Sequence, residues 1–318
     1  MKTAILMMAY GGPDTLDDIE PYLLDIRGGR PTSAELVAEI RERYAKIGGR
    51  SPLLEITRAQ ASALETALNR QAAASGGSGG FRVYVGMRHW KPYIREAVAQ
   101  IAADGITSGL AFCMAPHASK MSTGAYRQKL RAALDMLQQP PALDFIESWY
   151  EQPFLIKALA RNVQAALLRF EPQDRPTVHY LFTAHSLPAS LVAQGDPYAD
   201  QLRDTTRLLV AQLGLSPEQW SFAYQSAGAA PGQWLGPAIE ETLPALAAQG
   251  MRNVLVTPVG FTADHVEILF DLDIEAQAVA LEVGLHLERS PSLNASPDFI
   301  QGLAQFILEK TAVRNEQS

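Results

Sequence analysis

Short apolar runs alternate with longer segments of helical periodicity along most of this chain. The runs are rich in Val, Leu, Ile and Ala, and Gly, Pro or polar residues bound them. Such runs predict strands that are buried on both faces, as in parallel sheets covered by crossover helices. The predicted strands are 4–9, 82–86, 109–114, 144–147, 178–182, 221–225 and 254–259. The alternation indicates an α/β protein.

Helical periodicity dominates residues 17–70, with interruptions at Gly28-Gly29 and Gly48-Gly49. Further helices are predicted at 92–103, 153–168 and 297–310. The Gly/Ser-rich segment 75–80 is typical of a flexible surface loop rather than a domain linker.

The order of elements restarts near Val178. Strand 4–9 has a counterpart at 178–182, and strand 82–86 has one at 221–225. The sequence therefore predicts two similar Rossmann-like (flavodoxin-like) halves, each with a parallel sheet, and a cleft where their strand ends face each other. The predicted first half is 1–145 plus 288–318, which includes the last helix, and the second is 146–287.

Composition narrows the functional classes. The net charge of −7 disfavours nucleic acid as a partner, because phosphate binding needs a basic surface. A single cysteine, Cys113, excludes an intrachain disulfide and a cysteine-ligated iron–sulfur cluster. The first apolar run is short and leads directly into Gly11-Gly12-Pro13, and no apolar stretch approaches the roughly 18 residues of a membrane span. We expect a soluble, cytoplasmic protein without an integral membrane segment.

Two segments carry the candidate chemistry, 182–188 (FTAHSLP) and 261–267 (FTADHVE). Each follows a predicted strand, and ligands of open α/β sheets bind at the carboxyl ends of strands. His185 and Glu267 brought together there can move protons or hold a metal. The alternative for His185 is a satisfied core residue. Asp264 is interpreted as the N-cap of a helix beginning near His265.

Glu267, Asp271 and Glu275 follow one another at a spacing of four residues, so a regular helix would align them on one face. A solvated face is the ordinary interpretation. The alternative is a ridge of oxygen ligands that attracts a hydrated divalent cation.

Basic residues gather near Ser51, at positions 27, 30, 41, 43, 46 and 50. This cluster is either a solvated helix face or an entrance for carboxylates, for which guanidinium groups are suited. Tyr10, at the end of the first strand, has the simpler interpretation of a core cap. His89 and His117 are expected to be structural or rim residues.

Ordered motifs along essentially the whole chain resemble those of the ferrochelatases, the enzymes that insert ferrous iron into a porphyrin. They are MAYGGP at 8–13, RY…IGG…SP at 43–52, AHSLP at 184–188, GDPY at 195–198, YQS at 224–226, WLGP at 234–237, and ADHVE with the following LDIE at 263–275. The start and the length resemble the bacterial coproporphyrin III ferrochelatases, which form coproheme in haem biosynthesis.

The resemblance implies a porphyrin cleft between the halves. It places His185 and Glu267 as catalytic residues on one side of the macrocycle and Tyr10 on the other. It also implies that Arg27, Arg43, Ser51 and Tyr126 contact the porphyrin or its propionates. Together with the acidic ridge, the predicted metal ligands are His185, Glu267, Asp271 and Glu275. Two departures concern propionate binding: Gly28 stands where relatives often have arginine, and Arg88 where they often have lysine.

The predicted reaction takes coproporphyrin III and Fe²⁺ as substrates, with neutral His185 accepting pyrrole protons. No tightly bound cofactor is expected, although the acidic ridge offers a site for a second divalent cation. Transient contacts with neighbouring haem-pathway enzymes are the expected protein interactions. The open alternatives are a protoporphyrin IX ferrochelatase, a cobalt chelatase and a non-catalytic porphyrin-binding protein.

Overall fold

The structure is a computed structural model that describes residues 2–74, 80–228 and 232–317, with side chains up to residue 314. The chain divides into unit 1, Met1–Trp149 with Asn294–Ser318, and unit 2, Tyr150–Leu293. The predicted boundary after residue 287 would cut strand β8 (His286–Arg289), which pairs with β7 (Asn253–Pro258) inside unit 2. Most of the predicted loop 75–80 lies outside the described residues.

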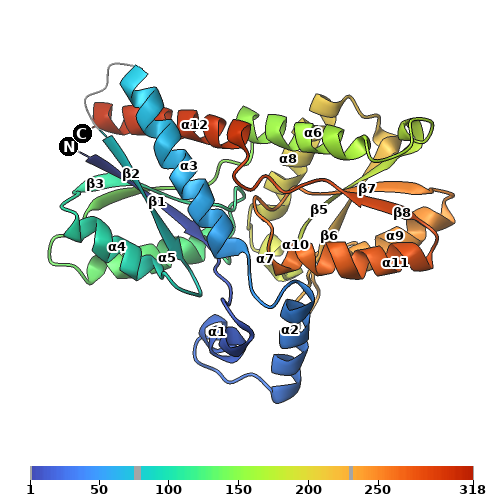
Figure 1. Cartoon of the computed structure of the whole chain (residues 1–318), viewed down its shortest axis with the longest axis horizontal. Coiled ribbons are helices and arrows are strands. Elements are labelled where there is room, and N and C mark those ends of the chain that lie inside the picture. Colours follow the sequence, from blue (N-terminus) through green and yellow to red (C-terminus); the bar gives the residue numbers. More distant parts are fainter. Residues whose placement is uncertain (1, 75–79, 229–231, 318) are drawn as a thin grey trace. The chain divides into compact units, whose positions relative to one another are not determined.

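Unit 1 is built on a four-stranded parallel sheet with the order β2-β1-β3-β4. Its strands are β1 (Lys2–Ala9), β2 (Gly80–Met87), β3 (Ser108–Cys113) and β4 (Ala142–Ile146). Side chains alternate between the two faces of a strand. Ala4, Leu6 and Met8 of β1 therefore share one face, where they form a core with α4 (Ile94–Ala103) and α5 (Thr123–Asp135). Helices α3 (Leu53–Ala74) and α12 (Pro297–Gln317) pack together on the other side (Figure 1).

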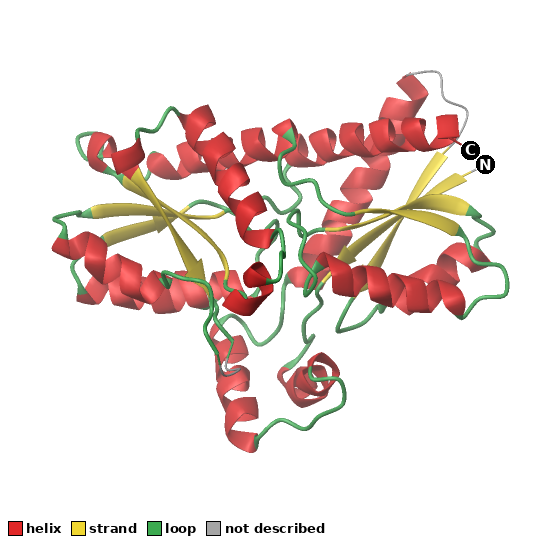
Figure 2. Ribbon diagram, turned by 180° about the vertical axis from the view of Figure 1, so that it is seen from behind, coloured by secondary structure: helices red, strands yellow, loops and turns green. Residues whose placement is uncertain are grey.

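The long N-terminal helical region consists of three helices separated by glycine turns. They are α1 (Ile19–Ile26), α2 (Ala34–Lys46) and α3. Gly28, Gly29, Gly48 and Gly49 all have positive φ, which L side chains rarely adopt, so the helices end where the sequence predicted. Helices α1 and α2 contact each other and lie away from the sheet of unit 1 (Figures 1 and 2).

Unit 2 repeats this plan, with the strand order β6-β5-β7-β8 and all pairs parallel. The strands preceding β7 are β5 (His179–His185) and β6 (Trp220–Gln225). One face packs on α9 (Ile239–Ala248), α10 (Val266–Leu269), the π-helical turn η4 (Asp271–Ala276) and α11 (Gln277–Glu282). Helices α6 (Pro153–Leu167) and α8 (Tyr198–Leu213) pack on each other, and a short helix α7 (Ala189–Ala193) precedes α8.

The two sheets have the same strand order, which confirms the predicted pair of parallel α/β halves. In each sheet the second strand lies on one side of the first strand, and the third and fourth strands lie on the other side. The gap between β5 and β7 is therefore a topological switch point, where loops separate and a ligand can enter. His185 ends β5, and the segment 259–267 follows β7.

Gly109 of β3 provides a test of the unit 1 sheet. It pairs with Ala4, and a Cβ atom there would lie 2.0 Å from the Ala4 carbonyl oxygen. We expect Gly109→Ala to lower the free energy of unfolding by about 1–3 kcal/mol, because the backbone of β1 or β3 must move to make room for the added Cβ atom. Gly80→Ala is the control, since its nearest neighbour would be an ordinary 3.5 Å away. Equal denaturant midpoints for the two variants would contradict the described register.

Candidate active site

The candidate active site lies in unit 2, at the carboxyl ends of β5 and β7. His185 is the last residue of β5, and Ser186 continues the alignment by donating its backbone N–H to the Gln225 carbonyl oxygen at 2.7 Å. The imidazole Nδ1 of His185 donates to the carbonyl oxygen of Ser186. This bond fixes the ring and turns Nε2 toward the segment that follows β7.

Glu267 is shared by two histidines. Its Oε1 lies 3.4 Å from His185 Nε2, and its Oε2 lies 3.1 Å from His265 Nε2. The Nδ1 atom of His265 donates to the Ala263 carbonyl oxygen at 2.9 Å. Both rings therefore have Nδ1 bound to backbone and Nε2 directed at one carboxylate, so each of the two contacts with Glu267 needs a proton to avoid facing lone pairs.

Charges within the cluster shift its pKa values. Burial alone would lower the pKa of His185, but the charge and hydrogen bond of Glu267, with the Ser186 carbonyl oxygen, raise this pKa to about 9. The pKa of His265 is also raised, because its bonds to Glu267 and Ala263 outweigh burial. Burial would raise the pKa of Glu267, yet the two imidazoles lower it. The raised pKa favours the protonated form of His185 near neutral pH, whereas the sequence-based expectation was a neutral imidazole.

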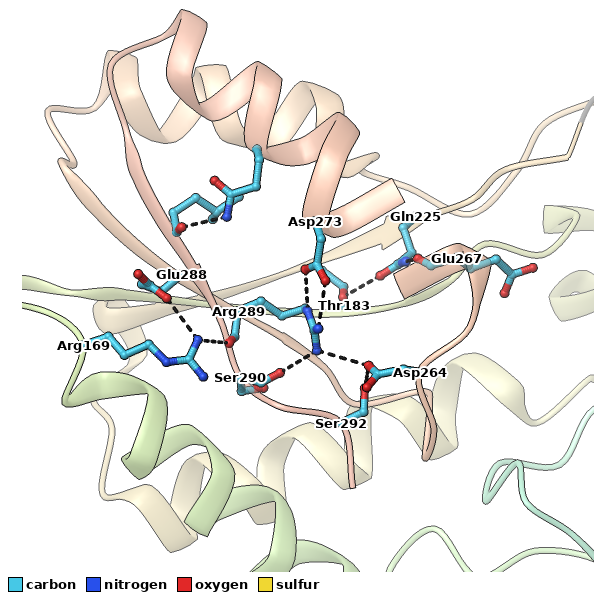
Figure 3. A network of polar contacts seen from close by, with 12 residues as sticks. Arg169, Thr183, Gln225, Asp264, Glu267, Asp273, Glu288, Arg289, Ser290 and Ser292 are labelled. Atoms are coloured by element: carbon cyan, nitrogen blue, oxygen red, sulfur yellow. Dashed lines mark hydrogen bonds and ion pairs between the residues drawn. The ribbon is translucent and has the colours of Figure 1, made fainter. Parts of the chain in front are cut away.

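Buried polar groups position Glu267 through its backbone. Gln225 donates from Nε2 to the Glu267 carbonyl oxygen at 2.6 Å and accepts at Oε1 from the Thr183 hydroxyl at 2.8 Å (Figure 3). Gly260 allows the strand ends to approach, because a Cβ atom there would lie 2.7 Å from the Ala184 Cβ. Residues at the ends of β5 and β6 therefore fix the Glu267 backbone from which the carboxylate extends.

The acidic ridge does not lie on a regular α-helix. After α10 the chain forms the π-helical turn η4, in which Glu275 N bonds to Phe270 O at 2.9 Å. Asp271 is buried and accepts from the Ser226 hydroxyl, and its charge contributes to the raised pKa of His185. Within the described residues, no group of three or more His, Cys, Asp or Glu side chains is arranged to hold a metal ion. The four-residue ligand set stays a prediction.

In unit 1, the residues at the equivalent strand ends form a different cluster. Tyr10 is 38% exposed, and the centroid of its ring lies 4.7 Å from that of His89. His89 is buried and its Nδ1 lies 2.8 Å from Asp25 Oδ1. The Arg88 guanidinium lies 5.6 Å from the Tyr10 ring centroid and 5.5 Å from that of the buried Tyr126.

The basic cluster is largely ion-paired. Arg43 Nη2 lies 3.0 Å from Glu39 Oε1 within α2, and Arg41, Lys46 and Arg50 also contact carboxylates. Arg27 is exposed at the end of α1, and its carbonyl oxygen accepts from Arg30 Nε. These positions fit the solvated-face interpretation and leave exposed guanidinium groups that carboxylates can reach.

Ser51 has a structural role in unit 1. It is buried, its N–H donates to the Pro13 carbonyl oxygen at 2.8 Å, and its Oγ accepts from Leu53 N at 3.3 Å. A Cβ at Gly12 would lie 2.4 Å from that Oγ atom, so the two segments are in close contact. The predicted contact between Ser51 and a porphyrin stays a prediction.

Two residues were misjudged from the sequence. Asp264 does not cap a helix; the N-cap of α10 is His265, and Asp264 instead accepts from Ser292 Oγ at 2.6 Å. His265 was considered only as a helix start, although it contacts Glu267. An imidazole two residues before a candidate carboxylate was a signal for this contact.

The overall fold matches that of solved chelatase structures. The structure is similar to the sirohydrochlorin chelatase SirB of Bacillus subtilis, solved with Fe³⁺ (TM-score 0.59, 12% identity) and, from subspecies spizizenii, with cobalt (TM-score 0.55, 10% identity). In both comparisons the match covers 100% of this chain and 98% of the other. At this identity the likeness shows a shared chelatase fold alone.

Sequence comparison identifies the family. The ferrochelatase family model matches residues 2–311. A ferrochelatase of Deinococcus radiodurans is 46% identical, covering 97% of this chain and 96% of its own, and a coproporphyrin III ferrochelatase of Halalkalibacterium halodurans is 38% identical with 98% of both chains covered. The chain therefore belongs to the ferrochelatase family, as the motifs indicated. Across the described residues, no helix has the length and apolar character required to cross a bilayer.

The raised pKa of His185 predicts a pH-dependent contribution to stability. A group whose pKa is higher in the folded state stabilises it most below the unfolded pKa, here about 6.5, and this contribution disappears as pH rises through about 9. The difference in unfolding free energy between wild type and His185→Gln should therefore be largest near pH 6 and shrink toward pH 9. Denaturant unfolding across this range measures it. A difference that grows with pH would contradict the described pair.

Proposed function

We propose that this protein inserts Fe²⁺ into a porphyrin and that coproporphyrin III is its preferred substrate. The observation that carries the proposal is the Glu267 carboxylate, which lies between two imidazoles at the carboxyl ends of β5 and β7 in a chain of the ferrochelatase family. Metallation releases two pyrrole protons, and this cluster can receive and pass on protons near neutral pH.

His185 is the proposed proton acceptor. Its Nδ1 is committed to the Ser186 carbonyl oxygen, so proton exchange occurs at Nε2. Because the pKa of this ring is about 9, the proton that it carries must leave before it accepts one from a pyrrole. Glu267 contacts this ring at Nε2 and its side chain is 32% exposed, so that proton can pass through the carboxylate to solvent. The two histidines and the carboxylate act as one titrating unit.

Asp271 and Glu275 are proposed ligands of the incoming cation, which would meet the half-buried Glu275 before the buried Asp271. Both lie on η4, within a few residues of Glu267, and carboxylate oxygens suit hydrated divalent ions. An approaching cation also favours loss of the His185 proton, since like charges repel. The arrival of the cation and the loss of the His185 proton would thus be coupled electrostatically.

Substrate choice rests on charge. Coproporphyrin III carries four propionates and protoporphyrin IX two, so the exposed guanidinium groups of unit 1 favour the former. Relatives named ferrochelatase and relatives named coproporphyrin III ferrochelatase both match this chain over nearly its full length. The direct test is anaerobic turnover of Fe²⁺ with each porphyrin in the same detergent-free buffer, followed by loss of free-porphyrin fluorescence. A higher kcat/KM for protoporphyrin IX would refute the substrate assignment, and turnover of neither porphyrin would refute the activity.

Removing the proton acceptor should slow turnover strongly without abolishing porphyrin binding. We expect His185→Ala to lower kcat roughly 10²–10⁴-fold, the usual contribution of a positioned acid or base. Glu267→Gln should lower kcat by a similar factor, because an amide carries no charge and accepts protons poorly. Porphyrin affinity should stay within about tenfold in both, or about 1.4 kcal/mol. His286→Gln, an exposed position on β8, is the control. Wild-type kinetics in either active-site variant would remove that residue from the mechanism.

Arg43 tests the propionate contact. We expect Arg43→Ala to weaken coproporphyrin III binding by about 1.5 kcal/mol, the lower range for a charged hydrogen bond. The exposed Glu39 carboxylate competes with a propionate for the Arg43 guanidinium and so offsets part of the binding free energy that Arg43 contributes. Glu39→Gln should accordingly strengthen binding. Fluorescence titration measures both, and equal weakening for a porphyrin tetramethyl ester would contradict a carboxylate contact.

A further inference from the structure

Both ends of the segment that carries the candidate catalytic groups are attached to one arginine. Asp264 and Asp273 enclose His265, Glu267 and Asp271 in sequence. Arg289, at the end of β8, donates from Nε to Asp273 Oδ1 at 2.6 Å and from Nη2 to Asp273 Oδ2 at 2.9 Å. Its Nη1 lies 3.4 Å from Asp264 Oδ1 and donates to the Ser290 carbonyl oxygen at 3.1 Å.

Figure 3 shows this guanidinium between the two carboxylates, with Glu267 directed away from it. The Arg289 side chain is only 15% exposed, and those of Asp264 and Asp273 are 21% and 33% exposed. Ser292 also holds Asp264 through its hydroxyl group. A planar guanidinium matches a carboxylate through two parallel bonds, whereas an ammonium group binds as a point charge. The contact therefore restrains orientation as well as charge.

The restrained segment has a backbone that needs external support. It passes from an extended residue, His265, through the short helix α10 into the π-helical turn η4. π-helical turns are rare and are usually single turns held by their surroundings. Asp273 lies inside η4, so its bidentate bond to β8 attaches this turn to the sheet. Asp264 attaches the start of the segment to the same point.

We propose that Arg289 is a positioning residue for metallation: by binding Asp264 and Asp273 together, it holds the intervening segment so that Glu267 faces both His185 and His265. This inference rests on the proposed function. The Glu267 carboxylate has contacts of 3.4 Å and 3.1 Å to its two partners. A displacement of the Glu267 carboxylate by about 1 Å would break at least one of its contacts with the two imidazoles. Misplacements of this size in active sites can lower the rate roughly a hundredfold.

A neighbouring arginine provides a matched control. Arg169 Nη1 lies 3.1 Å from Glu288 Oε2 and donates to the Arg289 carbonyl oxygen at 3.1 Å. It is thus an ion-paired arginine at the same strand, but its side chain makes none of the described contacts to the 264–273 segment. Arg169→Gln should change kcat by no more than about twofold, as is usual for exposed pairs.

The experiment compares Arg289→Gln, Arg289→Lys and Arg169→Gln with wild type, well below each unfolding midpoint. We expect Arg289→Gln to lower kcat per folded molecule roughly tenfold to a hundredfold, with a change in porphyrin KM of no more than about twofold. Arg289→Lys should recover only part of the lost kcat, because lysine restores the charge but not the two parallel hydrogen bonds of a planar guanidinium. Hydrogen exchange should become faster at residues 264–276 and stay unchanged in β5. If Arg289→Gln does not fold, Ser292→Ala removes only the hydroxyl that holds Asp264 and should show the same pattern at smaller amplitude.

Three results would overturn the inference: unchanged exchange at 264–276, faster exchange without a loss of kcat, or full recovery by lysine. The second result would leave Arg289 as a stabilising ion pair only. Failure of the proposed function is recognised separately, since wild type itself would then metallate neither porphyrin while the exchange measurement still reports on the segment.

Discussion

The sharing of the Glu267 carboxylate between His185 and His265 is the constraint on which the site depends. Two imidazoles bound to backbone carbonyl oxygens through Nδ1 present Nε2 to the same group. Such an arrangement is stable only with a proton between carboxylate and ring, and the raised pKa of His185 expresses this. The same attraction that stabilises the cluster also opposes its use as a base. A cation or a porphyrin that alters the local charge can change this balance, because each shifts the free energy of the protonated ring.

The supporting structure explains why the carboxylate stays in place. Gln225 and Thr183 hold the Glu267 backbone from the sheet, and Gly260 permits the close approach of the β7 loop to β5. These contacts are buried and uncharged, so they fix position with little effect on the charge balance of the cluster. Arg289 binds Asp264 and Asp273 in the same segment, so these two carboxylates are charge-paired.

Much of this architecture was predictable because strands buried on both faces are continuous apolar runs. The central strands β1, β3, β5 and β7, which are buried almost throughout, were recognised in this way. The more exposed β2, β4 and β6 were recognised from shorter runs, and the repeated order of elements predicted the common topology. Strand β8 was missed because its four residues, His286–Arg289, include three polar ones and lie at a sheet edge. The π-helical turn could not be inferred from spacing, since residues 271–276 also suit an α-helix. Asp264 was assigned to a cap because its partners, Ser292 and Arg289, are distant in sequence.

The shared strand order of the two units gives their corresponding strand ends comparable positions but different chemistry. At the end of β5 in unit 2, an imidazole meets a carboxylate that is restrained from several sides. After β1 in unit 1, the exposed Tyr10 ring packs on His89, with the Arg88 guanidinium nearby. An aromatic ring beside a cation suits contact with a flat, anionic macrocycle, whereas a titrating cluster suits proton transfer. One topology thus places an aromatic–cation contact after β1 and an imidazole–carboxylate cluster at the end of β5, in line with the proposed division between porphyrin binding and proton transfer.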